Sequence, residues 1–200
     1  MIALDGMPGA GKTTLLNNLR RRQPNTTVIF GEAQPPDGPL PEAHNTAYLL
    51  TEALSRIRTA RRLKRTHPCL TVASDRCHIG VLAYRYARMR TGAAPADDFH
   101  HALALTHRLG LTAPSAHDHI LVLTCTPAQS LHRRRAHSDN PHYRTWFDPH
   151  FLDHYHSFLT HLSTWIPATT FTLHDTTHHS AWPDLLNALP SQPTPAPEHP

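Results

Sequence analysis

The sequence predicts an α/β protein with a five-stranded parallel sheet that is covered by helices on both faces. Apolar runs of strand length alternate with amphipathic stretches of helical period along the 200 residues. Strands that are separated by helices pair in parallel, because the crossover helices pack on the faces of the sheet. A chain of this length can bury one sizeable core, and we therefore expect one domain over residues 1–189.

The elements of the first half follow from short apolar runs and from apolar residues spaced three and four apart. The longest helix is expected to have arginines on one side and apolar residues on the other, namely Leu49, Leu50, Ala53, Leu54, Ile57 and Leu63. A proline-rich loop precedes this helix. The strands are expected at 2–5, 27–30 and 69–74, the loop at 31–41, and the helices at 12–22, 45–65, 79–90 and 97–110.

In the second half, Pro127 and Pro149 suit the first turn of a helix, where proline's missing N–H is not needed. From Pro190 onward the chain is rich in proline and lacks large apolar residues, so we expect residues 190–200 to be a disordered tail. The strands of this half are expected at 120–124 and 169–173, and the helices at 127–137, 149–165 and 181–189.

The segment between the first strand and the first helix matches the phosphate-binding pattern G-x-x-x-x-G-K-[ST] at every fixed position. Its glycines let the backbone N–H groups point inward, and the helix N-terminus behind them adds positive potential for the α- and β-phosphates of a nucleotide. The loop consists of Gly6, Met7, Pro8, Gly9, Ala10, Gly11, Lys12 and Thr13. The sequence therefore predicts a site for ATP or GTP.

Lys12 and Lys64 are the lysines of a chain whose other basic residues are arginines. A compact ammonium on a flexible stem suits Lys12 to the β- and γ-phosphate oxygens. The Thr13 hydroxyl is expected to bind Mg²⁺, and Thr14 to satisfy free amides of the first helical turn. A glycine-rich turn that binds nothing is the alternative.

Composition limits the partners. The net charge of +4 and the pI near 9.3 favour an anionic ligand. The basic residues are dispersed and form no recognised nucleic-acid module, so specific nucleic-acid binding is not expected.

The separated residues Cys69, Cys77 and Cys125 indicate a reducing cytoplasm. Neither a signal peptide nor a membrane span is expected, and the oligomeric state, including a homodimer, is left open.

Histidine is abundant, with 19 residues, and several lie close together in the second half of the chain. They occur among equally frequent proline, threonine, alanine and arginine. No cysteine or carboxylate completes a tetrahedral set at regular spacing. We interpret the excess as compositional bias, with a zinc site as the alternative.

Asp75 and Arg76 directly follow the third strand, at the edge of the sheet where the phosphate loop is expected. A carboxylate at this position can bind Mg²⁺ directly or through water, and Arg76 would point to a phosphate or to a phosphoryl acceptor. An Asp–Arg ion pair that caps the next helix is the alternative.

Two segments, together with the phosphate loop, resemble a known family. Residues 74–84 (SDRCHIGVLAY) are similar to the D-R-x-x-x-S-x-x-A-Y segment of thymidylate kinases, and residues 121–134 (LVLTCTPAQSLHRR) to their strand, P-x-x-x-L and arginine-rich lid. The resemblance extends to the deoxynucleoside kinases and covers residues 1–189 in order. It implies the P-loop kinase fold with a helical, arginine-rich lid, and ATP with Mg²⁺ as donor.

By this resemblance, Arg133, Arg134 and Arg135, with Arg144 as a further candidate, belong to a lid that closes over ATP, and Arg133 is the first choice for catalysis. Such arginines neutralise the transferred phosphoryl group and exclude water. A solvated basic helix face is the alternative.

Glu32 resembles the glutamate that, in deoxynucleoside kinases, accepts the proton of the attacking hydroxyl. An exposed loop carboxylate is the alternative for Glu32.

The chain also departs from the thymidylate kinase pattern. Gly31 replaces the arginine that holds an acceptor phosphate, Gly80 replaces a serine, and Arg85 replaces a glutamine. Arg85 either meets an acidic or phosphorylated acceptor or pairs with a carboxylate. Arg56 and Arg58 are further candidates for the acceptor cleft.

These observations predict a kinase that moves the γ-phosphoryl group of ATP to a nucleotide or nucleoside-like small molecule. Its catalytic residues are expected to be Lys12, Glu32, Asp75, Arg76 and Arg133. Two alternatives remain. One is a kinase for a hydroxyl of a specialised metabolite or antibiotic, with Glu32 as the base. The other is a regulatory nucleotide-binding ATPase without a small-molecule acceptor.

Overall fold

The fold is a five-stranded parallel sheet with the strand order β2-β3-β1-β4-β5. The computed structural model describes residues 1–34, 41–113, 119–134, 141–167 and 169–177. The strands are β1 (Ile2–Gly6), β2 (Thr27–Phe30), β3 (Thr71–Asp75), β4 (His119–Thr124) and β5 (Thr172–Asp175). The predicted sheet is thereby confirmed.

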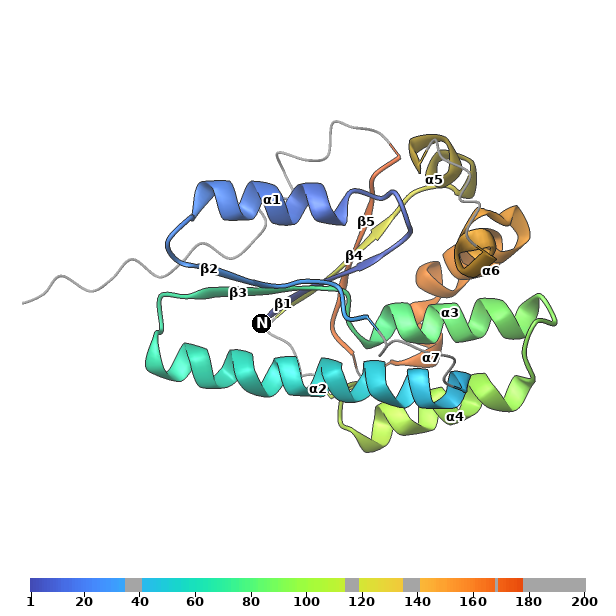
Figure 1. Cartoon of the computed structure of the whole chain (residues 1–200), viewed down its shortest axis with the longest axis horizontal. Helices are drawn as coiled ribbons and strands as arrows, with labels where there is room; N and C mark the ends of the chain where they lie inside the picture. Colours follow the sequence, from blue (N-terminus) through green and yellow to red (C-terminus); the bar gives the residue numbers. More distant parts are fainter. Residues whose placement is uncertain (35–40, 114–118, 135–140, 168, 178–200) are drawn as a thin grey trace, which may run out of the picture.

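Helices cover both faces of the sheet (Figure 1). Helix α1 lies on one face, and α2 and α3 lie on the other, where α4 packs against α2 and α3. The helices are α1 (Lys12–Arg22), α2 (Glu42–Thr66), α3 (His78–Arg90), α4 (Ala96–Arg108), α5 (Pro127–Arg134), α6 (Pro149–Thr160) and α7 (Leu162–Trp165), with the 3-10 helix η1 (Pro141–Phe147) before α6. Within the described residues, none of these helices is long and apolar enough to cross a membrane.

Three details of the second half differ from the sequence prediction. The helix expected at 149–165 is interrupted at His161, which ends α6 and precedes α7. The last strand covers Thr172–Asp175 and so begins later than the expected 169–173. The short 3-10 helix η1 was not anticipated. The expected helix at 181–189 and the tail at 190–200 lie outside the described residues.

The start of α6 shows how local sequence sets an element. The Asp148 carboxylate accepts a hydrogen bond from the backbone N–H of His150 at 2.9 Å, and Pro149 occupies the first helical turn. The helix then buries Phe151, Tyr155 and Phe158 completely or nearly so, as its apolar spacing predicts.

The core lies between the central strands and the two helical layers. Strands β1 and β4 are buried along almost their whole length, because each has a paired strand on both sides and helices on both faces. This arrangement fixes the carboxyl ends of all five strands at one edge of the sheet. Ligands of open α/β sheets bind at this edge.

Candidate active site

The phosphate loop follows β1 and turns sharply at Gly6, whose φ is +126°. A Cβ atom at this position would lie 1.9 Å from the carbonyl oxygen of Leu123, so the neighbouring strand β4 leaves room for glycine alone. Gly11 has a left-handed conformation with φ of 91° and precedes the first residue of α1. The sequence motif therefore has the strand before it and the helix after it that phosphate binding requires.

The carbonyl groups of this loop are held by donors from the surrounding protein. Pro8 O accepts from Ser130 Oγ at 2.7 Å and from Cys125 Sγ at 3.8 Å, Gly9 O from Arg133 Nη1 at 3.4 Å, and Ala10 O from Thr176 Oγ1 at 3.2 Å. These bonds hold the carbonyl groups of Pro8, Gly9 and Ala10 toward α5 and the segment after β5. The loop backbone is therefore fixed by the surrounding protein, as a phosphate-binding loop requires.

The side chain of Lys12 is almost fully buried, with 7% of its surface exposed. Its Nζ donates to the carbonyl oxygens of Gly6 at 3.0 Å and Met7 at 2.8 Å. Burial, with the charge of Arg76 nearby, lowers the pKa of Lys12 to about 8. Thr13 and Thr14, the next residues of α1, are exposed and border the same cavity.

Asp5 is a residue of the site region that sequence reasoning missed. Its carboxylate is fully buried and accepts three backbone N–H groups, from Gly6 at 2.8 Å, Cys77 at 2.9 Å and Gly80 at 2.7 Å. These bonds tie the end of β1 to the start of α3. An acidic residue that ends the otherwise apolar run Ile2–Leu4 is the signal that could have identified it.

Asp75, the last residue of β3, borders the cavity near the phosphate loop. Burial raises the pKa of its carboxyl group, and the positive charges of Lys12 and Arg76 oppose this increase. The carboxylate of Asp75 and the exposed hydroxyl of Thr13 line one cavity, as oxygen ligands for Mg²⁺ beside a triphosphate would. The residues present therefore fit the predicted metal.

Arg76 forms an ion pair with Glu32, from its Nε to Oε1 of the carboxylate. Arg76 has φ of 72°, rare for a residue with a side chain, and its N–H donates to the carbonyl oxygen of Leu4 at 2.8 Å. The guanidinium also lies 5.9 Å from the ring centre of Trp146. Arg76 thus combines an unusual backbone conformation with a pairing to Glu32. The alternative of a cap on the next helix is not what the structure shows, because α3 begins after Cys77 without a side-chain capping hydrogen bond.

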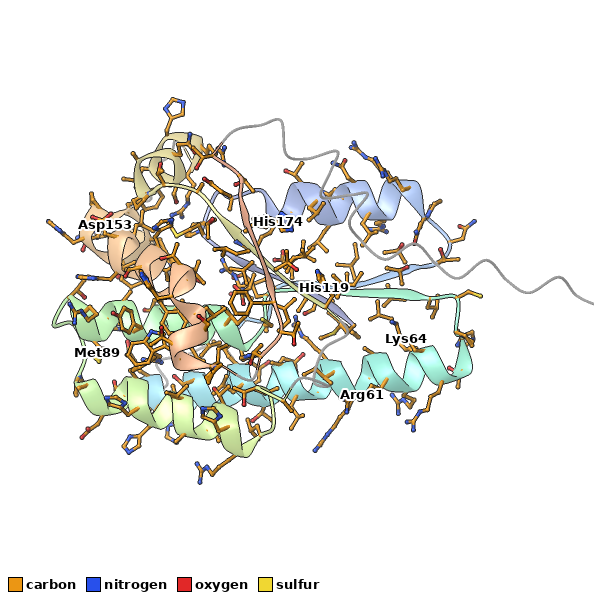
Figure 2. The ribbon with its side chains drawn as sticks, turned by 180° about the vertical axis from the view of Figure 1, so that it is seen from behind. Arg61, Lys64, Met89, His119, Asp153 and His174 are labelled. Carbon is orange, nitrogen blue, oxygen red and sulfur yellow. The ribbon has the colours of Figure 1, made fainter. Side chains whose placement is uncertain are left out.

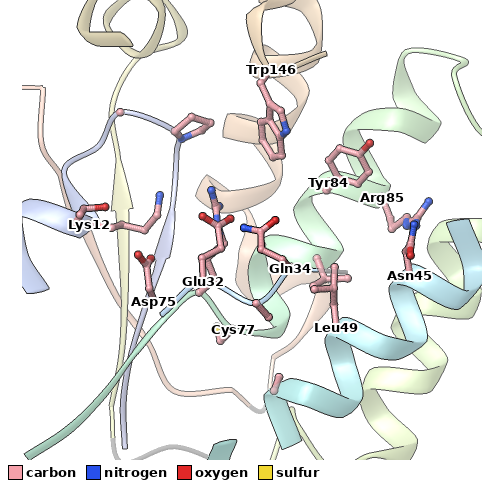
Figure 3. A pocket seen from close by; sticks show the side chains of 18 of the residues that line it. Lys12, Glu32, Gln34, Asn45, Leu49, Asp75, Cys77, Tyr84, Arg85 and Trp146 are labelled. Atoms are coloured by element: carbon pink, nitrogen blue, oxygen red, sulfur yellow. The ribbon is translucent and has the colours of Figure 1, made fainter. Parts of the chain in front are cut away.

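The phosphate loop, Glu32, Asp75 and Arg76 line one cavity of about 780 Å³ together with residues of α2 and α3. Figure 3 shows Lys12 and Asp75 on one side, Glu32 between them and the rest of the cavity, and Tyr84, Arg85, Asn45 and Leu49 on the far side. Its lining comprises Pro8, Gly9, Gly11, Lys12, Thr13, Thr14, Glu32, Ala33, Gln34, Glu42, Asn45, Thr46, Leu49, Ala53, Arg56, Asp75, Arg76, Cys77, Gly80, Val81, Tyr84, Arg85, Arg133, Arg134 and Trp146. One cavity therefore extends from the phosphate loop past Glu32 to residues of α2 and α3.

Arg85 is buried in the wall of this cavity, with 4% of its surface exposed. It pairs with the carboxylate of Glu42, to which Arg88 is also paired, and donates to the Glu42 carbonyl oxygen at 2.5 Å. Of the two roles considered for Arg85, the structure shows the pairing with a protein carboxylate.

The two arginines of α2 that were candidates for the acceptor cleft differ in position. Arg56 borders the cavity, whereas Arg58 is exposed beside a shallow basic depression that Arg61, Lys64 and Arg65 also line. Figure 2 shows Arg61 pointing away from the sheet on this outer side of α2. Only Arg56 therefore belongs to the cavity.

The predicted lid arginines lie at the end of α5. Arg133 Nη2 donates to the carbonyl oxygen of Thr176 at 2.6 Å, so this side chain joins the phosphate loop to the segment after β5. Arg134 Nη1 donates to the Trp146 carbonyl oxygen at 2.7 Å. Arg135 lies outside the described residues. Arg144 is exposed and is absent from the cavity lining.

Part of the histidine-rich sequence, including His117, His178 and His179, lies outside the described residues. In the part of the chain that the structure describes, no three side chains of His, Cys, Asp or Glu gather as a metal site.

Comparison with solved structures places the fold among nucleotide-binding kinases. Three structures of deoxyadenosine kinase from M. mycoides share it, with TM-scores of 0.57, 0.59 and 0.61 and sequence identities of 14%, 14% and 12%. Each alignment covers 94% of this chain and 97% or 98% of the kinase chain. These structures contain dATP, dCTP, or the products dCMP and dCDP, respectively.

No protein-family model matches the sequence, and no curated protein matches it either. At such low identity the structural likeness defines the fold and leaves the substrate undefined. The chain thus has the P-loop kinase fold of the deoxyadenosine kinases, which confirms the fold that the motif resemblance implied.

Proposed function

We propose that this protein is a kinase that transfers the γ-phosphoryl group of Mg²⁺-ATP to a hydroxyl group of a nucleoside-like small molecule. The observation that carries the proposal is the shared cavity, with the buried Lys12 of the phosphate loop on one side of Glu32 and space for an acceptor on the other. The deoxyadenosine kinases, whose structures contain deoxynucleotides, share the fold and support a nucleoside-like acceptor.

In this proposal the residues 6–13 hold the triphosphate. The loop amides bind the α- and β-phosphates, and Lys12 exchanges its bonds to loop carbonyl groups for bonds to the β- and γ-phosphates. Thr13 and Asp75 hold Mg²⁺, which neutralises phosphate charge when bound. Arg133 and Arg134 supply positive charge at the side of the loop that faces α5.

The reaction forms a bond between the acceptor oxygen and the γ-phosphorus. It breaks the bond between this phosphorus and the oxygen that joins it to the β-phosphate, and this oxygen leaves with ADP. Glu32 accepts the proton of the acceptor hydroxyl, and Arg76 orients the carboxylate through their ion pair. Most of the rate enhancement then comes from positioning and from neutralising charge on the transferred group.

A hydroxyl acceptor is favoured over a monophosphate. A monophosphate oxygen is already ionised and needs no base. The position before Glu32 is Gly31, which has no side chain to hold an acceptor phosphate. Arg85 is paired with Glu42 and so is not an unpaired cation awaiting an anion. The same reasoning keeps a hydroxyl-bearing specialised metabolite as an alternative acceptor.

An ADP-release assay over nucleosides, nucleoside monophosphates and hydroxyl-bearing metabolites tests the proposal. We expect a nucleoside to stimulate ADP release, and Glu32→Gln to reduce the stimulated rate by about 10²- to 10⁴-fold with ATP affinity unchanged. Stimulation by a monophosphate that survives Glu32→Gln would contradict the hydroxyl acceptor. ATP turnover that no acceptor stimulates would instead favour a regulatory ATPase.

A further inference from the structure

Arg56 is fixed on the inner side of α2 by contacts from its guanidinium in more than one direction. Its Nε donates to Oε1 of Glu52, one helical turn earlier, at 3.0 Å, and 12% of its side-chain surface is exposed. The ion pair holds the arginine in one orientation against the carboxyl ends of two strands. This contact with Glu52 leaves the outer nitrogens of the guanidinium for other partners.

The nitrogen Nη1 of Arg56 lies between the ends of β2 and β3. It donates to the carbonyl oxygen of Gly31 at 2.6 Å and lies 3.3 Å from Ser74 Oγ and 3.5 Å from the carbonyl oxygen of Asp75. Gly31 immediately precedes Glu32. The Arg56 guanidinium therefore connects the backbone next to Glu32 with the backbone of Asp75.

The pairing of β2 with β3 ends before both carboxylates. The registered pairs of β2 with β3 end at Phe30 and Ser74. β2 has four residues, lies at the edge of the sheet and pairs with β3 alone. Glu32 is thus two residues beyond the last pair of an edge strand, where the Arg56 bridge adds a connection that the ladder lacks.

We propose that Arg56 is a positioning residue that fixes the Glu32 carboxylate relative to Asp75. This inference rests on the proposed function, in which Glu32 is the base and Asp75 binds the metal. It explains what keeps these two residues at a fixed distance. Arg56 acts through Gly31 and Asp75 rather than on the substrate. Displacements of about 1 Å at such groups can reduce turnover by a factor of about 10².

The chemistry of the bridge requires arginine. Its planar guanidinium presents donors in a rigid fork, so Nε can bind Glu52 while Nη1 binds Gly31 and Ser74. The single ammonium of lysine cannot reproduce both sets of bonds from one fixed position. Arg56→Lys therefore keeps the charge and removes the bridge. Arg58→Lys is the matched control, because Arg58 is an exposed arginine of the same helix.

Two measurements test the proposal on the full chain. The first is hydrogen exchange of peptides containing residues 31–34 without substrate, which we expect to be faster in Arg56→Lys than in the parent and unchanged in Arg58→Lys. The second is kinetics with the best acceptor, where kcat should fall by about tenfold to a hundredfold in Arg56→Lys. The ATP affinity should stay within about twofold of the parent, since the bridge does not touch the phosphate loop.

The outcomes separate this inference from the proposed function. Unchanged exchange at residues 31–34 in Arg56→Lys overturns the bridge whether or not an acceptor is found. A parallel loss of kcat, ATP affinity and thermal stability also overturns it, because such a loss indicates general unfolding. Faster local exchange with no acceptor activity in the parent supports the bridge and counts against the kinase function.

Discussion

The Asp5 carboxylate and the backbone of Gly80 are in direct contact, with an Oδ2 to N distance of 2.7 Å. A Cβ atom on residue 80 would lie 2.6 Å from Oδ1 of the same carboxylate. Gly80 is the position where the thymidylate kinase segment has serine. A serine side chain at residue 80 would therefore press against the Asp5 carboxylate, which accepts the Gly80 N–H at close range.

Replacing Gly80 tests this relationship. Gly80→Ala would raise the helix propensity of α3 by about 1 kcal/mol, but its methyl group would push against a carboxylate held by three N–H groups. We expect a net destabilisation of about 1–3 kcal/mol in chemical denaturation. Gly31→Ala is the control, because an added Cβ there meets nothing within 4 Å. Equal stability of the Gly80→Ala and Gly31→Ala proteins would refute the account of Asp5.

The depressed pKa of Lys12 predicts a pH dependence of nucleotide binding. Burial lowers this pKa to about 8, so free Lys12 loses its proton as the pH rises through 8. A bound triphosphate favours the charged ammonium and raises the pKa. ATP affinity should therefore fall as the pH increases above about 8, with proton uptake on binding at pH 8.5. Calorimetry in buffers of different ionisation enthalpy measures this uptake, and proton release at this pH would exclude the predicted role.

Arg133 connects the phosphate loop with the segment after β5 through Gly9 and Thr176. Lysine at this position would keep the charge and lose the fork. We predict that Arg133→Lys lowers acceptor-dependent kcat by about tenfold or more, since charge neutralisation on the transferred group depends on fixed geometry. The exposed neighbour His132 provides the control variant His132→Ala. Steady-state kinetics that are indistinguishable between the two variants would remove Arg133 from the catalytic residues.

The parts of the site that depend on local sequence were predictable. The phosphate loop is a continuous motif between a strand and a helix, and parallel pairing then brings Asp75 and Arg76 to the same edge of the sheet. Periodicity also gave the long helix, although α2 begins at Glu42, three residues earlier than expected, directly after Pro41.

The contacts that sequence reasoning missed join residues far apart in the chain. Asp5 accepts from Cys77 and Gly80, which are 72 and 75 residues away. Glu42, the partner of Arg85, is 43 residues from it and lies beside a proline-rich loop with no periodic signal. Such pairs depend on how α2 and α3 pack against each other, and no local spacing encodes that packing.

The central claim is that the loop of residues 6–13 binds a nucleoside triphosphate with the help of Lys12. Calorimetric titration of Mg²⁺-ATP into the parent and into Lys12→Ala at pH 7 tests it most directly. We predict one saturable site in the parent and affinity weaker by about tenfold or more in Lys12→Ala, because a charge-assisted contact to phosphate is lost. Absence of saturable binding to the parent, for both ATP and GTP, would contradict the account.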